Sequence, residues 1–426
     1  MKTNVLSKKI DFKSGVSLTL FRNAEGRCSF PRCTRPAMGP SKSTNSSINM
    51  GMACHIYSAS LGGPRGRGGH AADFIESAAN GIWCCTHHGT LIDKMQGKDF
   101  PAETLFAWKR LAEARTRKRM DDMPSPLGWV ESIAYSEFAG FAIPPSATLS
   151  RNTLLCGTNS SGKTALLELA ASVSNSRYAW RFSSNSLSVV GSDKPHPIFR
   201  GNLRYSTVDT HDKVVEILVQ GDHIKRMEGK VAALLPPGDI EVLHVSSRDI
   251  ELLEKGDHIE MLMIALNVDK STMLALVQAG SSGLLPGEIK LTLGVEQGAC
   301  HERTYELHFK QKSKEFFIPF RRLSSSEKMK LLTDLLISKA REIAKQRLTL
   351  LLVDSAMSTL DSENFERLLR VLAAEQFQSI VVVSAVVAEK IIFLQDDGSA
   401  MLSQFEYLEP WRLAYLPPPR RSTTGS

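Results

Sequence analysis

The pattern of apolar and polar positions divides the chain near residue 128. Residues 27–93 are rich in Gly, Ser and Pro and have little periodic apolar pattern, which predicts a small fold that needs a bound metal in place of a large core. A helical pattern follows at 101–120 and ends in basic residues. Residues 121–128 contain two prolines and a glycine and predict a linker. The helix would bury one face made of Leu105, Trp108, Leu111 and Ala112.

From residue 129 the pattern changes to alternating strands and amphipathic helices. Strands are predicted at 129–141, 213–220, 290–295 and 303–310, and helices at 164–175, 261–267, 327–347 and 362–375. Two apolar runs, 348–353 and 379–383, predict buried parallel strands. We therefore expect an α/β fold over 129–416, with a meander early and parallel strands late. The polar, proline-containing tail at 417–426 is expected to be disordered.

Composition fits a soluble protein of two or three domains, because 42% of the 426 residues are apolar and 23% are charged. The longest apolar runs, such as 380–388, are too short to span a bilayer, and the N-terminus lacks the apolar region of a signal peptide. We expect a cytoplasmic location and no membrane partner.

Charge and cysteine are both concentrated at the N-terminus. Residues 1–128 hold 19 Lys and Arg against 10 Asp and Glu, so this part is the better candidate for contact with nucleic acid. Five of the seven cysteines lie in the first 85 residues, near three histidines. In a reducing compartment such a cluster indicates a metal site rather than disulfides.

Residues 157–164, Gly-Thr-Asn-Ser-Ser-Gly-Lys-Thr, match the phosphate-binding loop G-x-x-x-x-G-K-[ST], between an apolar stretch and a helix-like stretch. Lys163 is expected to bridge the β- and γ-phosphates, and the Thr164 hydroxyl to ligate Mg²⁺. The loop predicts binding of a nucleoside triphosphate, taken as ATP. The candidate ligands are Gly157, Asn159, Ser160, Ser161, Gly162, Lys163 and Thr164.

Three further pieces follow in chain order. Leu323–Glu327 (Leu-Ser-Ser-Ser-Glu) opens a long amphipathic helix, Leu350–Asp354 is an apolar strand ending in an acid, and Ser358–Asp361 comes soon after. With the phosphate loop they resemble the motif set of the ABC ATPases, as signature, Walker B and D-loop. A serine-rich helix start alone fits an ordinary capped helix equally well.

The resemblance implies a composite site shared by two chains. In that family the signature of one head meets the γ-phosphate held by the phosphate loop of a second head, so ATP joins a homodimer or a higher oligomer. Asp354 would bind Mg²⁺ together with Thr164. The segment between loop and signature has no long heptad run and so resembles the small RecF-like, OLD-like or defence-associated heads. The implied signature residues are Ser324, Ser325, Ser326 and Glu327.

The chain departs from the ABC pattern at its hydrolytic positions. Ser355 follows Asp354 where the family has a glutamate, and Ser384 stands where the switch histidine is expected. Neither serine is a strong general base, so slow or absent hydrolysis is expected. Asp361 and Glu363 are possible substitutes, and the family's Q-loop glutamine has no clear counterpart.

Cysteine and histidine spacing in the first part suggests a zinc site. Cys28-x₄-Cys33 and Cys85-x₂-His88 provide a tetrahedral set of three sulfurs and one nitrogen. Cys84 and His87 are the adjacent alternatives. Together with His55 and Asn80, these residues resemble the zinc-bearing HNH (ββα-metal) endonucleases over residues 27–93.

In an HNH enzyme the first His activates water and the Asn orients that His, roles that the resemblance gives to His55 and Asn80. The catalytic metal lacks its usual ligands here, because Cys54 stands at the acid position before His55 and Gly89 at the position of the last His. An active nuclease and a zinc fold that binds DNA or a partner therefore both remain open. The basic pieces Arg65–Arg67 and Arg115–Arg119 would suit phosphate contacts on DNA.

The sequence thus predicts an HNH-like zinc module at 1–120 and an ABC-type ATPase head at 129–416. The combination resembles Septu-type anti-phage systems, in which the two modules normally lie on separate chains. ATP-dependent head dimerisation would then control a DNA-directed nuclease or binding module. The alternatives are a non-catalytic assembly subunit whose zinc module docks a separate effector protein, and a RecF-like DNA-repair ATPase.

Overall fold

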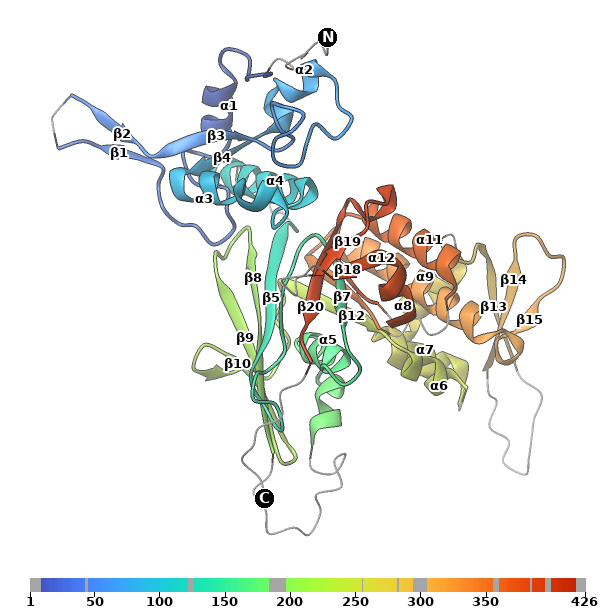
Figure 1. The fold of residues 1–426 in the computed structure, drawn as a ribbon. Coiled ribbons are helices and arrows are strands. Elements are labelled where there is room, and N and C mark those ends of the chain that lie inside the picture. Colours follow the sequence, from blue (N-terminus) through green and yellow to red (C-terminus); the bar gives the residue numbers. More distant parts are fainter. Residues whose placement is uncertain are drawn as a thin grey trace, which may run out of the picture. The chain divides into compact units, whose positions relative to one another are not determined.

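The computed structural model describes residues 9–42, 45–121, 126–183, 197–254, 256–281, 283–293, 305–354, 360–383, 385–394 and 400–418. The chain forms two compact units (Figure 1). The first comprises Met1–Glu131 with the short pieces Arg204–Lys213 and Glu409–Arg412, and the second contains the remainder of the chain. None of the described helices is long and apolar enough to cross a membrane.

The first unit is built around a ββα element. Strands β3 (Gly51–His55) and β4 (Gly81–Cys85) pair antiparallel, with His55 opposite Gly81, and helix α3 (Thr86–Leu91) packs on both. The hairpin of β1 and β2 extends away from the rest of this unit (Figure 1). The other elements are α1 (Val16–Asn23), β1 (Met38–Pro40), β2 (Ser47–Asn49), α2 (Ala72–Ile75) and α4 (Ala102–Asp121).

The expectation that the first unit lacks a sizeable core is wrong. Isolated apolar residues of the Gly- and Ser-rich segment, among them Ile56, Ile82 and Ile92, are fully buried. They form one cluster because α4 covers them with the apolar face that its sequence predicts, which buries Leu105, Trp108, Leu111 and Ala112. Residues 27–93 need no regular apolar pattern of their own, because α4, which lies outside that segment, completes the core.

The assignment of Arg65 and Arg115 to DNA phosphates is also wrong. Arg115 is 4% exposed; its guanidinium donates to the carbonyl oxygens of Pro31 at 3.0 Å and Thr207 at 2.8 Å, and burial lowers its pKa to about 10. Arg65 donates to the carbonyl of Ile92 at 2.6 Å and pairs with Asp93. Both guanidinium groups are used inside the unit, where they satisfy buried carbonyls that would otherwise lack donors.

The second unit contains a five-stranded sheet in the order β12-β16-β17-β7-β20. The first four strands are mutually parallel, and all six residues of β16 are buried. Helix α9 (Ser325–Ile343) packs on β12 and β16, and α5 (Lys163–Ala171) packs on β12 and β7. The strands are β7 (Asn152–Gly157), β12 (Ile240–Val245), β16 (Leu348–Val353), β17 (Gln378–Val382) and β20 (Trp411–Leu416).

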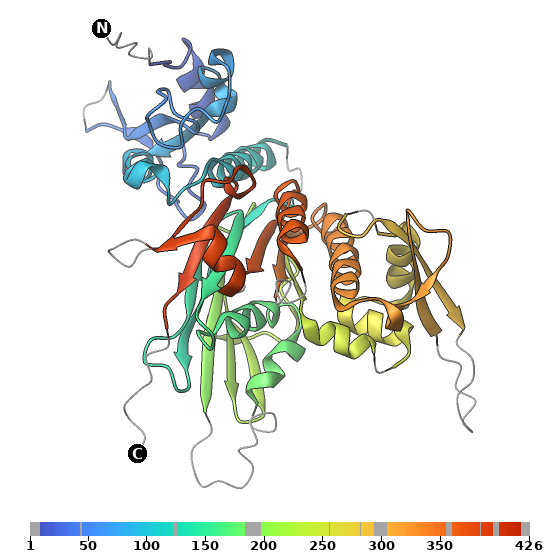
Figure 2. The same cartoon turned by 45° about the vertical axis from the view of Figure 1, so that its right-hand side comes forward.

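A six-stranded sheet has the order β11-β10-β9-β8-β5-β6, and consecutive strands β8 to β11 form the predicted meander. A three-stranded sheet of β13, β14 and β15 lies on the far side of α9 from the five-stranded sheet (Figures 1 and 2). The strand bounds are β5 (Gly128–Phe138), β6 (Ser146–Thr148), β8 (Ile198–Thr207), β9 (Lys213–Gln220), β10 (His223–Glu228), β11 (Val231–Ala232), β13 (Gly287–Leu293), β14 (Tyr305–Gln311) and β15 (Ile318–Pro319).

The remaining elements are α6 (Ser247–Leu253), α7 (His258–Leu266), α8 (Lys270–Ala279), α11 (Ser362–Ala373), α12 (Ala385–Ile391), β18 (Ile392–Leu394) and β19 (Ala400–Leu402). Each strand and helix predicted from the pattern after residue 129 has a counterpart here, which confirms the α/β class. The pattern missed several other elements, among them β8, β10, β12, α6 and α8. The end of the predicted strand at 290–295 lies outside the described residues.

Replacement of Arg115 by Ala should destabilise the first unit by roughly 1–3 kcal/mol, because it leaves buried carbonyls without a donor. Chemical denaturation followed by tryptophan fluorescence measures this, since Trp83, Trp108, Trp129 and Trp411 all belong to the first unit. The exposed Arg117, two residues along the same helix, is the matched control, and Arg117→Ala should leave the midpoint unchanged. Equal midpoints for both variants would contradict a structural role for Arg115.

Candidate nucleotide and metal sites

The phosphate loop connects the end of β7 to the start of α5, and its two glycines are required sterically. Gly157 has φ +156°, and a Cβ there would lie 2.6 Å from the Leu416 carbonyl oxygen. Gly162 has φ +90°, and its Cβ would lie 2.9 Å from Pro145 Cγ. Larger residues would therefore change the course of the loop. At its tip Asn159 and Ser160 are exposed, and Ser160 itself has φ +63°.

Lys163 bends back over the loop that precedes it. Its ammonium group donates to the carbonyl oxygens of Gly157 and Thr158, both at 2.8 Å. Burial lowers the pKa of Lys163, and the charges of Cys156 and Asp354 oppose that shift. The buried Ser161 hydroxyl has no hydrogen-bond partner within the part of the chain that the structure describes. A cation and a buried hydroxyl thus line the loop, as phosphate binding requires.

Asp354 lies at the same edge of the sheet as the phosphate loop. It follows β16 directly, is 2% exposed, and donates its backbone N–H to Val245 of β12 at 2.8 Å. Since β12, β16 and β7 run parallel, their carboxyl ends meet at one edge, where ligands bind in α/β sheets. Thr164, the second residue of α5, is half-buried there. Ser355, Ser384 and residues 358–359 lie outside the described residues.

Sequence reasoning missed a charged cluster at this edge. Glu168 of α5 is 3% exposed, and its two oxygens pair with Arg181 and Arg248, each at 2.8 Å. Arg248 comes shortly after the carboxyl end of β12, next to Asp354. The sequence does contain a sign of this cluster, because Glu168 interrupts the apolar run Ala165–Ala171. An acid on a buried helix face requires a charged or hydrogen-bonding partner.

The serines predicted to form the signature lie at the start of helix α9. Ser324 is the N-cap: its hydroxyl accepts from the Glu327 N–H at 3.2 Å, and the Glu327 carboxylate accepts from the Ser324 N–H at 2.9 Å. Glu327 therefore serves the capping box, while Ser325 and Ser326 occupy the first turn. Asp361 caps α11 by accepting from the Asn364 N–H at 2.8 Å, so its carboxylate is used structurally.

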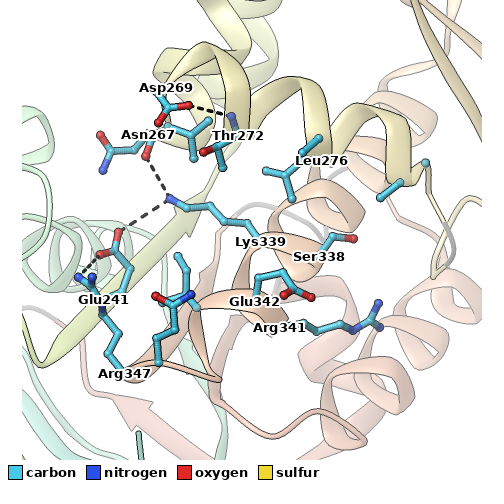
Figure 3. A pocket seen from close by; sticks show the side chains of 16 residues that line it. Glu241, Asn267, Asp269, Thr272, Leu276, Ser338, Lys339, Arg341, Glu342 and Arg347 are labelled. Atoms are coloured by element: carbon cyan, nitrogen blue, oxygen red, sulfur yellow. Dashed lines mark hydrogen bonds and ion pairs between the residues drawn. The ribbon is translucent and has the colours of Figure 1, made fainter.

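A cavity of about 780 Å³ lies between α8, the second half of α9 and the start of β12 (Figure 3). Lys339 donates to the Leu266 carbonyl at 2.6 Å and lies 3.8 Å from Glu241, and burial lowers its pKa to about 8. Arg347 lies 3.7 Å from the same carboxylate. Because Glu241 is at the amino end of β12, this cavity is separate from the nucleotide edge.

In the first unit, the ligand atoms of Cys28, Cys33, Cys85 and His88 lie within 4.8 Å of one another. His88 Nδ1 is 3.2 Å from Cys85 Sγ and 3.5 Å from Cys28 Sγ. Tetrahedral zinc with bonds of about 2.3 Å to sulfur and 2.0 Å to nitrogen would hold such atoms roughly 3.5–3.8 Å apart. The donor set and its spacing therefore fit Zn²⁺. The stacked Phe30 ring, 4.1 Å away, holds the His88 imidazole in place.

Asn80 does not orient His55 as expected. The Asn80 side chain accepts from the Tyr57 N–H and donates to the Tyr57 carbonyl, both at 2.8 Å, and no hydrogen bond joins it to His55 among the described residues. His55 stacks on Phe12 at 3.7 Å, and burial lowers its pKa. Asn80 instead fixes the backbone after β3, because its amide closes that bend from both sides.

Gly89, where the HNH resemblance expects the last metal-binding histidine, lies against side chains of β3. Gly89 of α3 faces β3, and a Cβ there would lie 2.6 Å from Met52 Sδ and 2.9 Å from Cys54 Sγ. A histidine at position 89 would therefore require the side chains of Met52 and Cys54 to move. Asp93, the acid that follows α3, pairs with Arg65 at 2.6 Å.

Comparisons with known proteins give only weak likenesses. No protein-family model and no curated protein match the chain. A crystal structure of the Smc head domain from Pyrococcus furiosus, bound to the C-terminal domain of ScpA, is 13% identical, with a TM-score of 0.41 over 65% of this chain and 96% of that chain. The recombination mediator RecF with ATP is 15% identical, with a TM-score of 0.44 over 64% and 96%. The SMC head domain from Thermotoga maritima is 15% identical, with a TM-score of 0.33 over 65% and 99%.

Purified protein should contain about one zinc per chain, because the clustered thiols and imidazole match its preferred ligands. Elemental analysis should show loss of the metal in Cys28→Ser and Cys85→Ser. The neighbouring variants Cys84→Ala and His87→Ala are the matched controls and should keep it. Zinc retained in Cys85→Ser but lost in Cys84→Ala would show that the adjacent cysteine is the ligand.

Proposed function

We propose that residues 129–416, most of which belong to the second unit, are an ATP-binding head of ABC type. The observation that carries this proposal is the meeting of the phosphate loop, Asp354 and the end of β12 at the carboxyl edge of one parallel sheet. ATP with Mg²⁺ is the ligand that this edge fits. Lys163 would hold the β- and γ-phosphates, and Thr164 and Asp354 would hold the metal ion.

Two heads would associate around the nucleotide. Ser324, Ser325 and Ser326 begin a 19-residue helix whose partial positive charge suits a phosphate supplied by a second chain. ATP would then join a homodimer, because neither half-site alone encloses the γ-phosphate. Hydrolysis would be slow, since Ser355 cannot take a proton from water as the family's glutamate does.

For residues 1–120 we propose a zinc-held module that binds DNA or docks a separate effector, rather than a nuclease. Two residues favour this reading, because Gly89 and Cys54 stand where the HNH resemblance expects metal ligands and neither supplies the expected histidine or acid. In this scheme the chain is a component of an anti-phage system in which ATP-dependent head association controls the position of the zinc module. A RecF-like role in DNA repair would share the ATP-binding head but would need no effector.

A non-hydrolysable ATP analogue should convert monomers to dimers, as measured by light scattering after size exclusion. Lys163→Ala should abolish nucleotide binding, because it removes the charge that holds the phosphates. Ser324→Arg should bind nucleotide like the wild type but should stay monomeric, because it blocks the trans contact. Association of Ser324→Arg at wild-type level would remove the support for an ABC-type composite site.

Plasmid DNA incubated with the protein, ATP and Mg²⁺ or Mn²⁺ should stay intact, because the catalytic metal lacks its ligands. Gel mobility and nicking are measured together, so that DNA binding without cleavage is visible. Cleavage by the wild type that disappears in His55→Ala would restore the HNH endonuclease reading. Cleavage that persists in His55→Ala would point to a contaminating nuclease, and His87→Ala serves as the matched control.

A further inference from the structure

A buried carboxylate joins the helix of the phosphate loop to the end of β12. Glu168 lies in α5, five residues after Lys163, and is 3% exposed. Its Oε1 pairs with Arg248 Nη1 and its Oε2 with Arg181 Nη1, both at 2.8 Å. The two arginine side chains are 60% and 40% exposed, so the carboxylate is enclosed while its partners reach solvent. If one arginine leaves, the buried Glu168 carboxylate still has the other arginine as its charged partner.

The turn that contains Arg248 follows the β12 residue to which Asp354 bonds. Ser246 donates its N–H to the Asp249 carboxylate at 2.9 Å, which closes the turn that contains Arg248. The Asp354 N–H bonds to Val245 just before that turn. The long side chain of Arg248 therefore starts at the nucleotide edge and ends at Glu168, with most of its surface in solvent.

Phosphate oxygens could give Arg248 a second hydrogen bond, which Glu168 does not supply here. A guanidinium binds phosphate oxygens in a bidentate manner, whereas here it makes a single contact with one carboxylate oxygen. Asp354 acts electrostatically on both Lys163 and Glu168, which places all three charges in one neighbourhood. Lys163 is likewise held by protein oxygens, those of Gly157 and Thr158.

We propose that Arg248 senses the γ-phosphate, leaving Glu168 for the phosphate oxygens when the head holds ATP and staying with Glu168 when it holds ADP. Arg181 stays on Glu168 in both states. The proposal deepens the ATP-binding function proposed above and rests on it.

The exchange would reach the signature helix through contacts already present. Arg248 is the second residue of α6, and α6 packs on α9. Glu254, directly after α6, pairs with Lys328 of α9 at 2.6 Å, one turn after Ser324. Movement of the α6 turn would therefore shift the helix that begins with the signature serines. The γ-phosphate bound to one head would in this way influence the association of that head with a second one.

Calorimetric titration with ATP and with ADP, both with Mg²⁺, tests the proposal on the full chain. Arg248→Ala should lower the preference for ATP over ADP by roughly 10- to 100-fold, the range for loss of a hydrogen bond between charged groups. ADP affinity should stay at the wild-type value, which also shows that the variant is folded. Arg181→Ala, which removes the other partner of Glu168, is the matched control and should keep the wild-type preference.

An unchanged preference in Arg248→Ala would overturn the sensing role while leaving the ATP site intact. An equal loss in Arg181→Ala would also overturn it, because the effect would then come from Glu168 and the position of α5. Absence of nucleotide binding by the wild type would instead overturn the ATP-binding function itself. The conservative variant Arg248→Lys should keep part of the preference, since it retains the charge but not the bidentate geometry.

Discussion

The parallel pairing of β12, β16, β17 and β7 is the constraint on which the second unit depends. β16 is buried along its whole length and is apolar except at Thr349, so it needs neighbours on both edges and helices against its faces. That requirement aligns the carboxyl ends of strands far apart in the chain. The phosphate loop, Asp354 and the turn with Arg248 then lie at one edge because the strands before them are parallel.

Charged side chains form hydrogen bonds and ion pairs inside both units. Arg115 and Arg65 satisfy carbonyl groups in the first unit, and Glu168 holds two arginines beside the phosphate loop of the second. Burying such groups is costly unless every charge is paired, so their positions are strongly determined. A single basic run can thus contain both kinds of arginine: Arg115 is buried and structural, whereas Arg117 is exposed.

The zinc set and the apolar core stabilise different parts of the first unit. Cys28, Cys33, Cys85 and His88 gather at one end of the ββα element, and α4 closes the apolar cluster. Metal binding would fix the loop around Cys28 and Cys33, while α4 contributes the apolar area that a metal cannot replace. The metal set and the apolar cluster therefore both hold the ββα element in place.

The sequence by itself determined the α/β class, the phosphate loop and the spacing of the zinc set, because each depends on residues close together in the chain. Gly157, Gly162 and Lys163 act within one turn, and Cys85 and His88 flank the start of one helix. Only the tertiary structure decided which charges are internal and what surrounds Gly89. Those facts depend on contacts between residues far apart in the chain, which no local pattern encodes. Arg115 and Thr207 are 92 residues apart, and Glu168 and Arg248 are 80 residues apart.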